Sequence, residues 1–278
     1  LLSQSGVATL NEAIGGSFGS WTIYFIAMSF VMTHSLNESG FTSRLVAKFM
    51  SMKFVSKSPW VMTFSIGALA MLLGAFLDQV PATAFMLAFC DRVYRELGYS
   101  KDDSYPHIQN VIAVFCVNIG GAMTPISHPL TIIGLGVYEG ITKQSISLFK
   151  YLSFGVPTGL VIFFLLVLLF RLFAKPDFSK FKDFDIRRVL DKQTKMGLRE
   201  KSIVFIFFGT VIMWMLPGIL AMFIPDAAIV KTLNGFGITF WALVAVVLLS
   251  VLEIGKRPLI GNIKEVIDTK VPWSLMLF

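Results

Sequence analysis

Apolar segments long enough to cross a lipid bilayer are the feature that most limits what this chain can fold into. Crossing about 30 Å of hydrocarbon takes roughly 20 helical residues. Four segments have that length: Phe18 to Leu36, Tyr151 to Phe173, Ser202 to Ile224 and Gly235 to Leu252. Because unpaired backbone groups are costly in lipid, each is expected to be a helix. The sequence therefore predicts an all-α polytopic integral membrane protein, with the lipid bilayer as its surroundings.

Two further apolar segments, Trp60 to Cys90 and Ile108 to Val137, are too long to be one plain span each. A straight helix of either would be roughly 45 Å long. In the first segment, the apolar arm from Ala82 to Cys90 gives only about 13 Å of helix before the charges of Asp91 and Arg92. We interpret residues 58–93 as a re-entrant helical hairpin, which enters and leaves the membrane on one side.

The hairpin interpretation decides the orientation of the chain. It places 21 of the 24 lysines and arginines on one side of the membrane, in residues 38–58, 91–104, 171–201 and 254–270. The positive-inside bias makes that side cytoplasmic. We therefore expect a cell (plasma or inner) membrane protein with cytoplasmic basic loops, the largest being residues 174–200. The net charge of +7 comes without a basic stripe interleaved with aromatic residues, so no nucleic-acid partner is expected.

A short amphipathic segment precedes the hairpin. Between Asn37 and Lys57, apolar residues recur every four positions, and Arg44 and Lys48 share another face. This spacing predicts an interfacial helix. The alternative is the wet end of the preceding span, and both interpretations place the segment at the membrane surface.

The two ends of the chain resemble each other. The segment from Leu10 to Ile14, followed by Trp21, recurs as the segment from Ile263 to Ile267, followed by Trp273. Chance similarity in so apolar a chain is one explanation. The other is an inverted-topology repeat, which is typical of secondary transporters. A full second copy does not fit before Phe278, so we expect a truncated chain that covers roughly the first repeat.

Asp78 is the only acidic residue between Trp60 and Cys90. A carboxylate at membrane depth costs about 2.5 kcal/mol or more unless it is paired. It therefore needs a partner, a proton or a cation, and Na⁺ is a candidate. Pro81 suits the first turn of a following helix, whose free N–H groups could face an anion. The alternative is that Asp78 only caps a helix in an exposed loop.

The second long segment contains two glycines and two prolines between Asn118 and Pro129. A continuous helix is not expected there, and irregular backbone at membrane depth is tolerated where protein buries it or where it lines a wet cavity. The alternative is a proline-kinked structural helix. We expect a non-helical middle near Gly121 to Pro129, close to Asp78. The candidate substrate-binding or ion-binding residues of the two segments are Asp78, Gln79, Val80, Thr83, Asn118, Gly120, Gly121, Thr124, Pro125, Ser127, His128 and Pro129.

Enzymatic chemistry finds little support in the sequence. The three histidines lack the spacing and the acidic or cysteine neighbours of a zinc site. A membrane-embedded aspartyl enzyme would need a second carboxylate beside Asp78, and the two interrupted segments offer none. We expect neither an enzyme nor a bound cofactor, apart from Na⁺ or H⁺ as a coupling ion.

At these residues the sequence resembles the ion transporter superfamily, which contains the divalent anion/sodium symporters, the arsenite-pump permeases and D-type sodium/proton antiporters. The symporters carry Ser-Asn-Thr at a hairpin tip before an arm like Thr-Ala-Met-Met-Leu, and the arm here is Thr83 to Leu87. The tip differs, since Asp78, Gln79 and Val80 replace Ser-Asn-Thr and are nearer the Asp-Asn-Val-Thr-Thr of the arsenite-pump branch. Residues 118–129 resemble the Ile-Gly-Gly and Thr-Leu-Ile-Gly-Thr-Pro-Pro segments of the symporters' broken helix.

The resemblance implies a division of the chain into scaffold and transport parts. The scaffold would comprise residues 1–57 and 201–278. The transport domain, residues 58–173, would contain the hairpin, a broken helix over 105–140 and a helix over 151–173. It also implies homodimers and an elevator-like movement of the site.

We expect a secondary active transporter of a small anion, similar to a di- or tricarboxylate, coupled to Na⁺ or H⁺. The alternative is an arsenite-pump-like or Na⁺/H⁺ exchange permease of the same superfamily. A third class is a membrane scaffold or receptor without transport activity.

Overall fold

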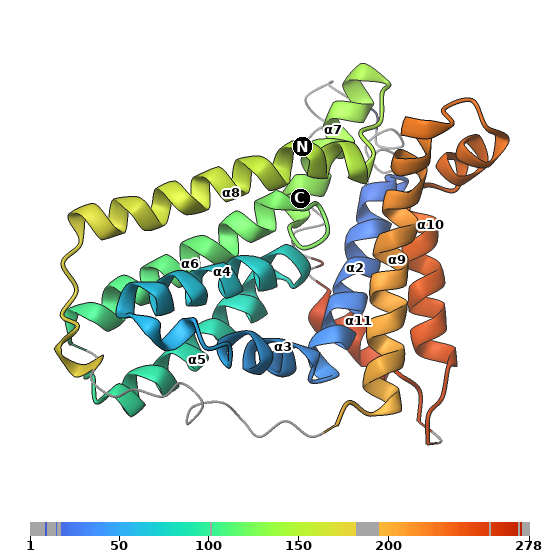
Figure 1. Cartoon of the computed structure of the whole chain (residues 1–278). Helices are drawn as coiled ribbons and strands as arrows, with labels where there is room; N and C mark the ends of the chain where they lie inside the picture. Colours follow the sequence, from blue (N-terminus) through green and yellow to red (C-terminus); the bar gives the residue numbers. More distant parts are fainter. Residues whose placement is uncertain are drawn as a thin grey trace. The chain divides into compact units, whose positions relative to one another are not determined.

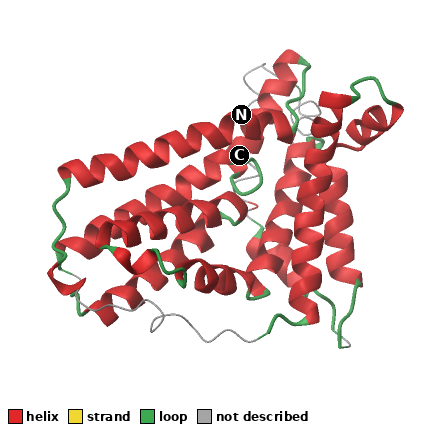
Figure 2. Cartoon of the chain, in the orientation of Figure 1, coloured by secondary structure: helices red, strands yellow, loops and turns green. Residues whose placement is uncertain are grey.

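The computed structural model describes residues 9, 15, 18–100, 102–181, 195–255, 257–271 and 273. Within these residues there is no β-strand, only an isolated bridge between Glu253 and Pro258, so the all-α prediction is confirmed (Figure 2). The helices are α2 (Trp21–Glu38), α3 (Phe41–Met50), the 3₁₀ turn η1 (Val55–Lys57), α4 (Pro59–Phe76), α5 (Gln79–Leu97), α6 (Ser104–Met123), α7 (Pro129–Thr142), α8 (Leu148–Phe173), the 3₁₀ turn η2 (Ser179–Phe181), α9 (Leu198–Phe223), α10 (Ala228–Val251) and α11 (Ile263–Lys270).

Four of these helices are long and apolar enough to cross a membrane: α4, α8, α9 and α10. Three of them correspond to predicted spans, with α10 beginning at Ala228 rather than at Gly235. The fourth predicted span became α2, whose last turn ends in Asn37 and Glu38 and is therefore less apolar. The remaining helix that is long and apolar enough to cross a membrane is α4, the first arm of the predicted hairpin.

The chain divides into two compact units. One comprises residues 1–35, 129–150 and 201–278, and the other comprises residues 36–128 and 151–200. Helices α3 to α6 and nearly all of α8 belong to the second unit, which we call the hairpin unit. Helix α7, almost all of α2 and α9, and the whole of α10 and α11 belong to the first, which we call the α9–α10 unit (Figure 1). These contact units divide the chain at different residues from the scaffold and transport domains suggested by resemblance, whose functional assignment stays a prediction.

The hairpin unit is built around α4 and α5. Ser58 caps the start of α4 by accepting a hydrogen bond from the backbone N–H of Val61, and Pro59 occupies the first helical position, where a missing N–H costs nothing. Only Leu77 and Asp78 separate α4 from α5, and the two helices contact each other and α6 (Figure 1). The two helices therefore form a hairpin.

The second arm of the hairpin is longer than the sequence analysis predicted. Helix α5 continues past Asp91 and Arg92 to Leu97, about 28 Å in all. The Asp91 carboxylate pairs with Arg95 one turn later on the outer face, at 2.5 Å, while Cys90, Val93 and Leu97 are buried. Charges on one face only do not end a helix, so α5 continues beyond residue 93, where the predicted hairpin ends.

Helices α4 and α6 pack with their backbones close together. A Cβ atom at Gly74 would collide with the carbonyl oxygen of Val117, and one at Gly120 would collide with that of Met71. Small residues at a crossing let two helices approach until only backbone separates them. This crossing lies one turn before the end of each helix and therefore brings those ends together.

Helix α8 covers one side of the hairpin unit. Phe64 of α4 packs against Phe163 with ring centroids 5.0 Å apart, and the Tyr151 hydroxyl donates to the carbonyl of Ala122 at 2.8 Å. Much of its remaining surface consists of exposed apolar side chains such as Phe164, Leu168 and Leu172. Such a face suits lipid contact.

Helix α3 is amphipathic, as its spacing predicted. Thr42, Val46, Ala47 and Met50 are buried, and Lys48 is exposed. Arg44 does not share the exposure of Lys48, because its guanidinium binds both carboxylate oxygens of Glu200 at 2.7 and 2.9 Å. The position of this helix at a membrane surface stays a prediction.

The α9–α10 unit packs α2, α9 and α10 side by side (Figure 1). Phe25 of α2 lies 5.2 Å from Trp214 of α9, measured between ring centroids, and the Trp214 indole donates to the carbonyl of Ile238 in α10 at 2.8 Å. Helix α10 is interrupted at Gly237, whose φ of 67° and ψ of 171° are not helical. The predicted repeat begins at Leu10 to Ile14, which lies outside the described residues.

Candidate functional site

The tip of the hairpin consists of Leu77 and Asp78. Leu77 ends α4 by bonding back to the carbonyl of Leu73 at 2.8 Å and then adopts an extended backbone. Asp78 is the N-cap of α5, because its carboxylate accepts a hydrogen bond from the backbone N–H of Val80 at 3.0 Å. The capping role that the sequence analysis held open is therefore present. The side chain is only partly buried, so capping does not close the carboxylate to other contacts.

The second interrupted segment breaks at Thr124 to His128, between α6 and α7. We call these five residues the break. A break in this region is what the glycines and prolines predict, but it begins three residues later than expected. Gly120 and Gly121 are in the last turn of α6, where they serve close packing rather than an irregular backbone.

Two hydroxyls join the break to the end of α4. Thr124 donates a hydrogen bond to the carbonyl of Ala75 at 2.6 Å, and Ser127 donates to the carbonyl of Gly74 at 2.5 Å. Both side chains are buried. The last carbonyls of a helix have no partner within it, and these hydroxyls supply that partner.

Gln79 and His128 bring further polar groups to the same place. The Gln79 amide nitrogen lies so close to Gly121 that a Cβ atom there would stand 2.5 Å from it. That nitrogen is buried and has no hydrogen-bond acceptor among the described residues. His128 lies near enough to Asp78 for the two side chains to interact electrostatically. The hairpin tip and the break thus form one polar region, as predicted.

The other candidate residues are not all part of this region. Val80 is 77% exposed. Asn118 is exposed and its amide donates to the carbonyl of Val114 in its own helix at 2.9 Å, so it points away from α4. Thr83 is partly buried one turn into α5, Pro125 is buried in the break, and Pro129 begins α7.

No cluster of three histidine, cysteine or acidic residues suited to a metal ion occurs within the described part of the chain. A transported cation at the hairpin tip would have to use Asp78 together with backbone or hydroxyl oxygens. Such oxygen ligands suit Na⁺.

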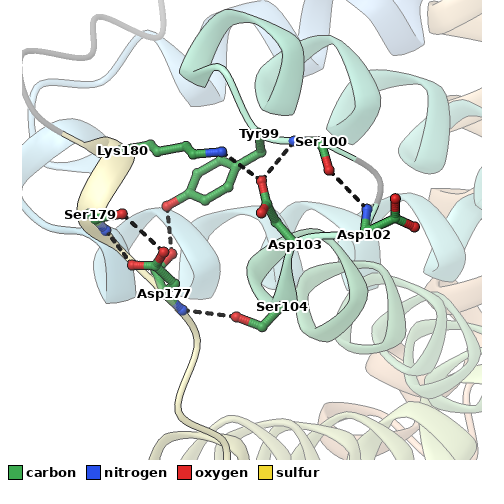
Figure 3. A network of polar contacts seen from close by, with 8 residues as sticks. All are labelled: Tyr99, Ser100, Asp102, Asp103, Ser104, Asp177, Ser179 and Lys180. Carbon is green, nitrogen blue, oxygen red and sulfur yellow. Dashed lines mark hydrogen bonds and ion pairs between the residues drawn. The ribbon is translucent and has the colours of Figure 1, made fainter.

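Sequence reasoning did not find a polar cluster at the other end of the hairpin unit (Figure 3). There the segment after α8 is fastened to the loop between α5 and α6. Tyr99 donates to the carbonyl of Asp177 at 2.6 Å, Lys180 pairs with Asp103 at 2.7 Å, and the backbone N–H of Asp177 donates to Ser104 at 3.0 Å. These residues are 73 to 78 positions apart in sequence, so no local pattern could reveal them.

The carboxyl groups of this cluster are electrostatically stabilised. The hydrogen bond from Lys180 lowers the pKa of Asp103, with a smaller contribution from the backbone N–H of Ser100. The backbone N–H and hydroxyl of Ser179 lower the pKa of Asp177. Both carboxylates are accessible to solvent and already paired, so this cluster holds a loop in place rather than offering a binding site.

Comparison with known proteins adds independent information. The chain matches the family model described as "Citrate transporter" (CitMHS) over residues 1–278. It is also 23% identical, over 214 residues, to the protein named "Sodium-dependent dicarboxylate transporter SdcS" of Staphylococcus saprophyticus. That alignment covers 73% of this chain but 41% of the relative, so the chain spans less than half the length of this curated relative.

Both matches are to transport proteins, which confirms the expectation that the chain is not an enzyme. They also confirm the resemblance to the ion transporter superfamily that the hairpin and broken-helix motifs carry. With a family match along its whole length and four helices able to cross a membrane, this chain is an integral membrane protein that belongs to the citrate transporter family.

Proposed function

We propose that the protein is a secondary active transporter of a small di- or tricarboxylate anion, coupled to Na⁺ or H⁺. One observation carries the proposal: the end of α4 and the break are joined by buried hydrogen bonds close to Asp78 and Gln79, in a chain of the citrate transporter family. The name of the Staphylococcus saprophyticus relative supports the dicarboxylate and the sodium.

Asp78 at the tip and the next residue, Gln79, have complementary chemistry. The buried Gln79 amide nitrogen is a hydrogen-bond donor without an acceptor, and a substrate carboxylate would supply one. The Asp78 carboxylate next to it would repel the same anion unless a proton or cation neutralised it. Cation binding at Asp78 would therefore have to accompany anion binding, and that requirement is the physical basis of coupled transport.

The direct test is transport by the intact protein in proteoliposomes. Asp78→Asn keeps the shape of the cap but removes the charge. We expect citrate or succinate accumulation driven by the cation gradient to fall more than tenfold, while exchange of bound anion across the membrane persists if protons couple. If sodium couples, Asp78→Asn should instead weaken sodium activation at constant pH.

Asp226→Asn is the matched control, because Asp226 is an exposed carboxylate outside both interrupted segments. Its uptake should equal that of the wild type. Undiminished, cation-driven accumulation by Asp78→Asn would show that the carboxylate is only a cap. Sodium/proton exchange without any anion flux would support the alternative permease type, and flux of neither kind would support a scaffold or receptor.

We further propose basic loops on the cytoplasmic side of the plasma membrane, an inverted repeat, homodimers and an elevator-like movement. The division of the chain into two contact units supports a moving and a static part. The dimer rests on the resemblance, and its mass in detergent tests it.

Cysteine labelling tests the sidedness, since the native Cys90 and Cys116 are buried. Lys57→Cys and Glu96→Cys, at exposed positions on either side of the hairpin, should react from the same side of sealed vesicles, and Lys231→Cys from the other. Labelling of Lys57→Cys and Glu96→Cys from opposite sides would contradict the re-entrant hairpin.

A further inference from the structure

Two of the last carbonyl groups of α4 accept hydrogen bonds from side chains outside the helix. In a continuous helix the carbonyls of Gly74 and Ala75 would accept from the backbone N–H groups four residues later, but the helix ends at Phe76. Side chains from a segment about 50 residues away take those places, Ser127 on Gly74 and Thr124 on Ala75. The end of the first hairpin arm is therefore completed by the break and not by its own sequence.

We propose that Thr124 and Ser127 are positioning residues that latch the break to the hairpin tip and hold Asp78 in its cation-binding geometry, rather than ligands of the transported anion. The cation in this inference rests on the proposed function. The two hydrogen bonds of the latch do not depend on it.

The hydrogen-bond inventory of the two side chains excludes them as donors to an anion in this arrangement. A hydroxyl group has one proton to donate, and both protons point at carbonyls of α4, at 2.6 and 2.5 Å. A carboxylate accepts hydrogen bonds and donates none. Contact between a substrate carboxylate and either hydroxyl would require the latch to open first.

The geometry of the two bonds explains why one hydroxyl would not suffice. Gly74 and Ala75 are consecutive, so their carbonyls differ by about 100° around the helix and about 1.5 Å along it. One bond fixes a separation, whereas two bonds in different directions also prevent rotation of the break about the helix end. The close approach of α4 and α6 at Gly74 and Gly120 brings the short side chains within reach.

A measurement without transport tests the latch first. Thr124→Val and Ser127→Ala remove one hydroxyl each with little change of shape, and Thr124→Ser restores one. Hydrogen exchange of the purified protein should report on the backbone N–H groups of Leu77, Val80 and Ala82, which bond to Leu73, the Asp78 side chain and the Asp78 carbonyl. We expect exchange to accelerate about fivefold in either single variant and about thirtyfold in the double variant, with Thr124→Ser close to wild type.

Transport then distinguishes positioning from ligation. In Thr124→Val the cation concentration for half-maximal uptake should rise about tenfold while the maximal rate and the KM for the anion change less than twofold. Thr232→Val and Ser250→Ala are matched controls, because both hydroxyls bond a carbonyl of their own helix, α10. Both should leave tip exchange and cation activation unchanged.

Two results would overturn the inference. A raised KM for the anion, with unchanged exchange at the tip, would make the hydroxyls substrate ligands. Unchanged hydrogen exchange at the tip in both single variants would show that the hydroxyls do not hold the break to α4. If the wild-type protein carries no anion, the proposed function fails, but the exchange measurement still decides whether the latch exists.

Discussion

The break between α6 and α7 and the interruption inside α10 differ in how the chain supports them. The break after α6 runs over five residues, from Thr124 to His128, and two buried hydroxyls tie it to another helix. The interruption of α10 is a single residue, Gly237, and the Trp214 indole supports the carbonyl next to it. The break contains the imidazole of His128 and has the carboxylate of Asp78 nearby.

Under the proposed function, the break is the functional interruption and Gly237 is a structural one. Exposed polar backbone is costly inside a membrane, so both need partners. At Gly237 the partner is an indole, which can donate a hydrogen bond but cannot accept one or bind a cation through a lone pair. At the break the partners are hydroxyls within a polar region that also holds an unpaired amide nitrogen. Of the two interruptions, the break is the one that combines hydroxyls, an imidazole and a nearby carboxylate, the groups on which the proposed transport site rests.

The largest effect should come from separating α6 from α4 just before the break. Gly120→Ala would place a methyl group against the carbonyl of Met71 and 3.0 Å from the backbone nitrogen of Ala75. Because backbone cannot move aside cheaply, we expect a loss of about 3 kcal/mol of unfolding free energy, measured by denaturation in detergent.

Gly209→Ala is the control for this variant, since a Cβ atom there meets nothing within 4 Å. It should be neutral or stabilise by up to about 1 kcal/mol, as alanine favours helix over glycine. Equal stability of the two variants would mean that the α4–α6 crossing is looser than described.

A smaller loss should follow from filling the interruption of α10. At Gly237 a φ of 67° combined with a ψ of 171° is open to glycine almost alone. Gly237→Ala should therefore lose about 2 kcal/mol through backbone strain, visible as a lower thermal midpoint. Gly235→Ala, two residues away and equally uncrowded, should change the midpoint little, and a matching loss there would point to packing rather than to strain.

Removing the support of that interruption should have a smaller effect still. Trp214→Phe deletes the donor to Ile238 at a position only 3% exposed, at a cost of about 1 kcal/mol. Trp273→Phe deletes a similar indole bond, to the carbonyl of Ile267, at a position 40% exposed. Water can replace that bond, so the denaturation midpoint of Trp273→Phe should stay unchanged. Transport should persist in both variants.

The smallest effect is expected for the polar contacts of Asp103, Asp177 and Lys180, because their side chains are accessible to solvent. Because pairing lowers the pKa of Asp103 and Asp177 in the folded protein, their contribution is complete above the ordinary pKa of about 4 and is lost as pH falls through the lowered values. A nitroxide at Lys175→Cys should therefore become mobile only at pH values below about 4.

Lys180→Met is the variant that checks the cause of this pH dependence. Without the ammonium group, the pKa of Asp103 returns toward its ordinary value, so the mobile form should appear at a higher pH than in the otherwise identical labelled protein. The same onset in both proteins would show that the ion pair does not hold the loop.

The sequence predicted more of the fold than of the site. Apolar length and the run of glycine and proline between Asn118 and Pro129 predicted the spans and the break, because these properties act locally along the chain. The sequence did not indicate the interruption at Gly237, since one glycine within an apolar run is compatible with an ordinary helix. It also ended the second hairpin arm too early, at residue 93, because a linear pattern does not reveal which face of a helix remains exposed.

The sequence by itself determined that the chain is an all-α membrane protein with a hairpin and a broken helix, because burying backbone polar groups in lipid leaves helices as the solution. Only the tertiary structure decided what the polar residues of these segments do. It turned Asn118 away to bond its own helix, placed the Gln79 amide against Gly121, and directed the hydroxyls of Thr124 and Ser127 to carbonyls of α4. The physical reason is that a hydroxyl or amide acts on whichever partner packing brings within about 3 Å. For Thr124 and Ser127 that partner lies about 50 residues away in the chain.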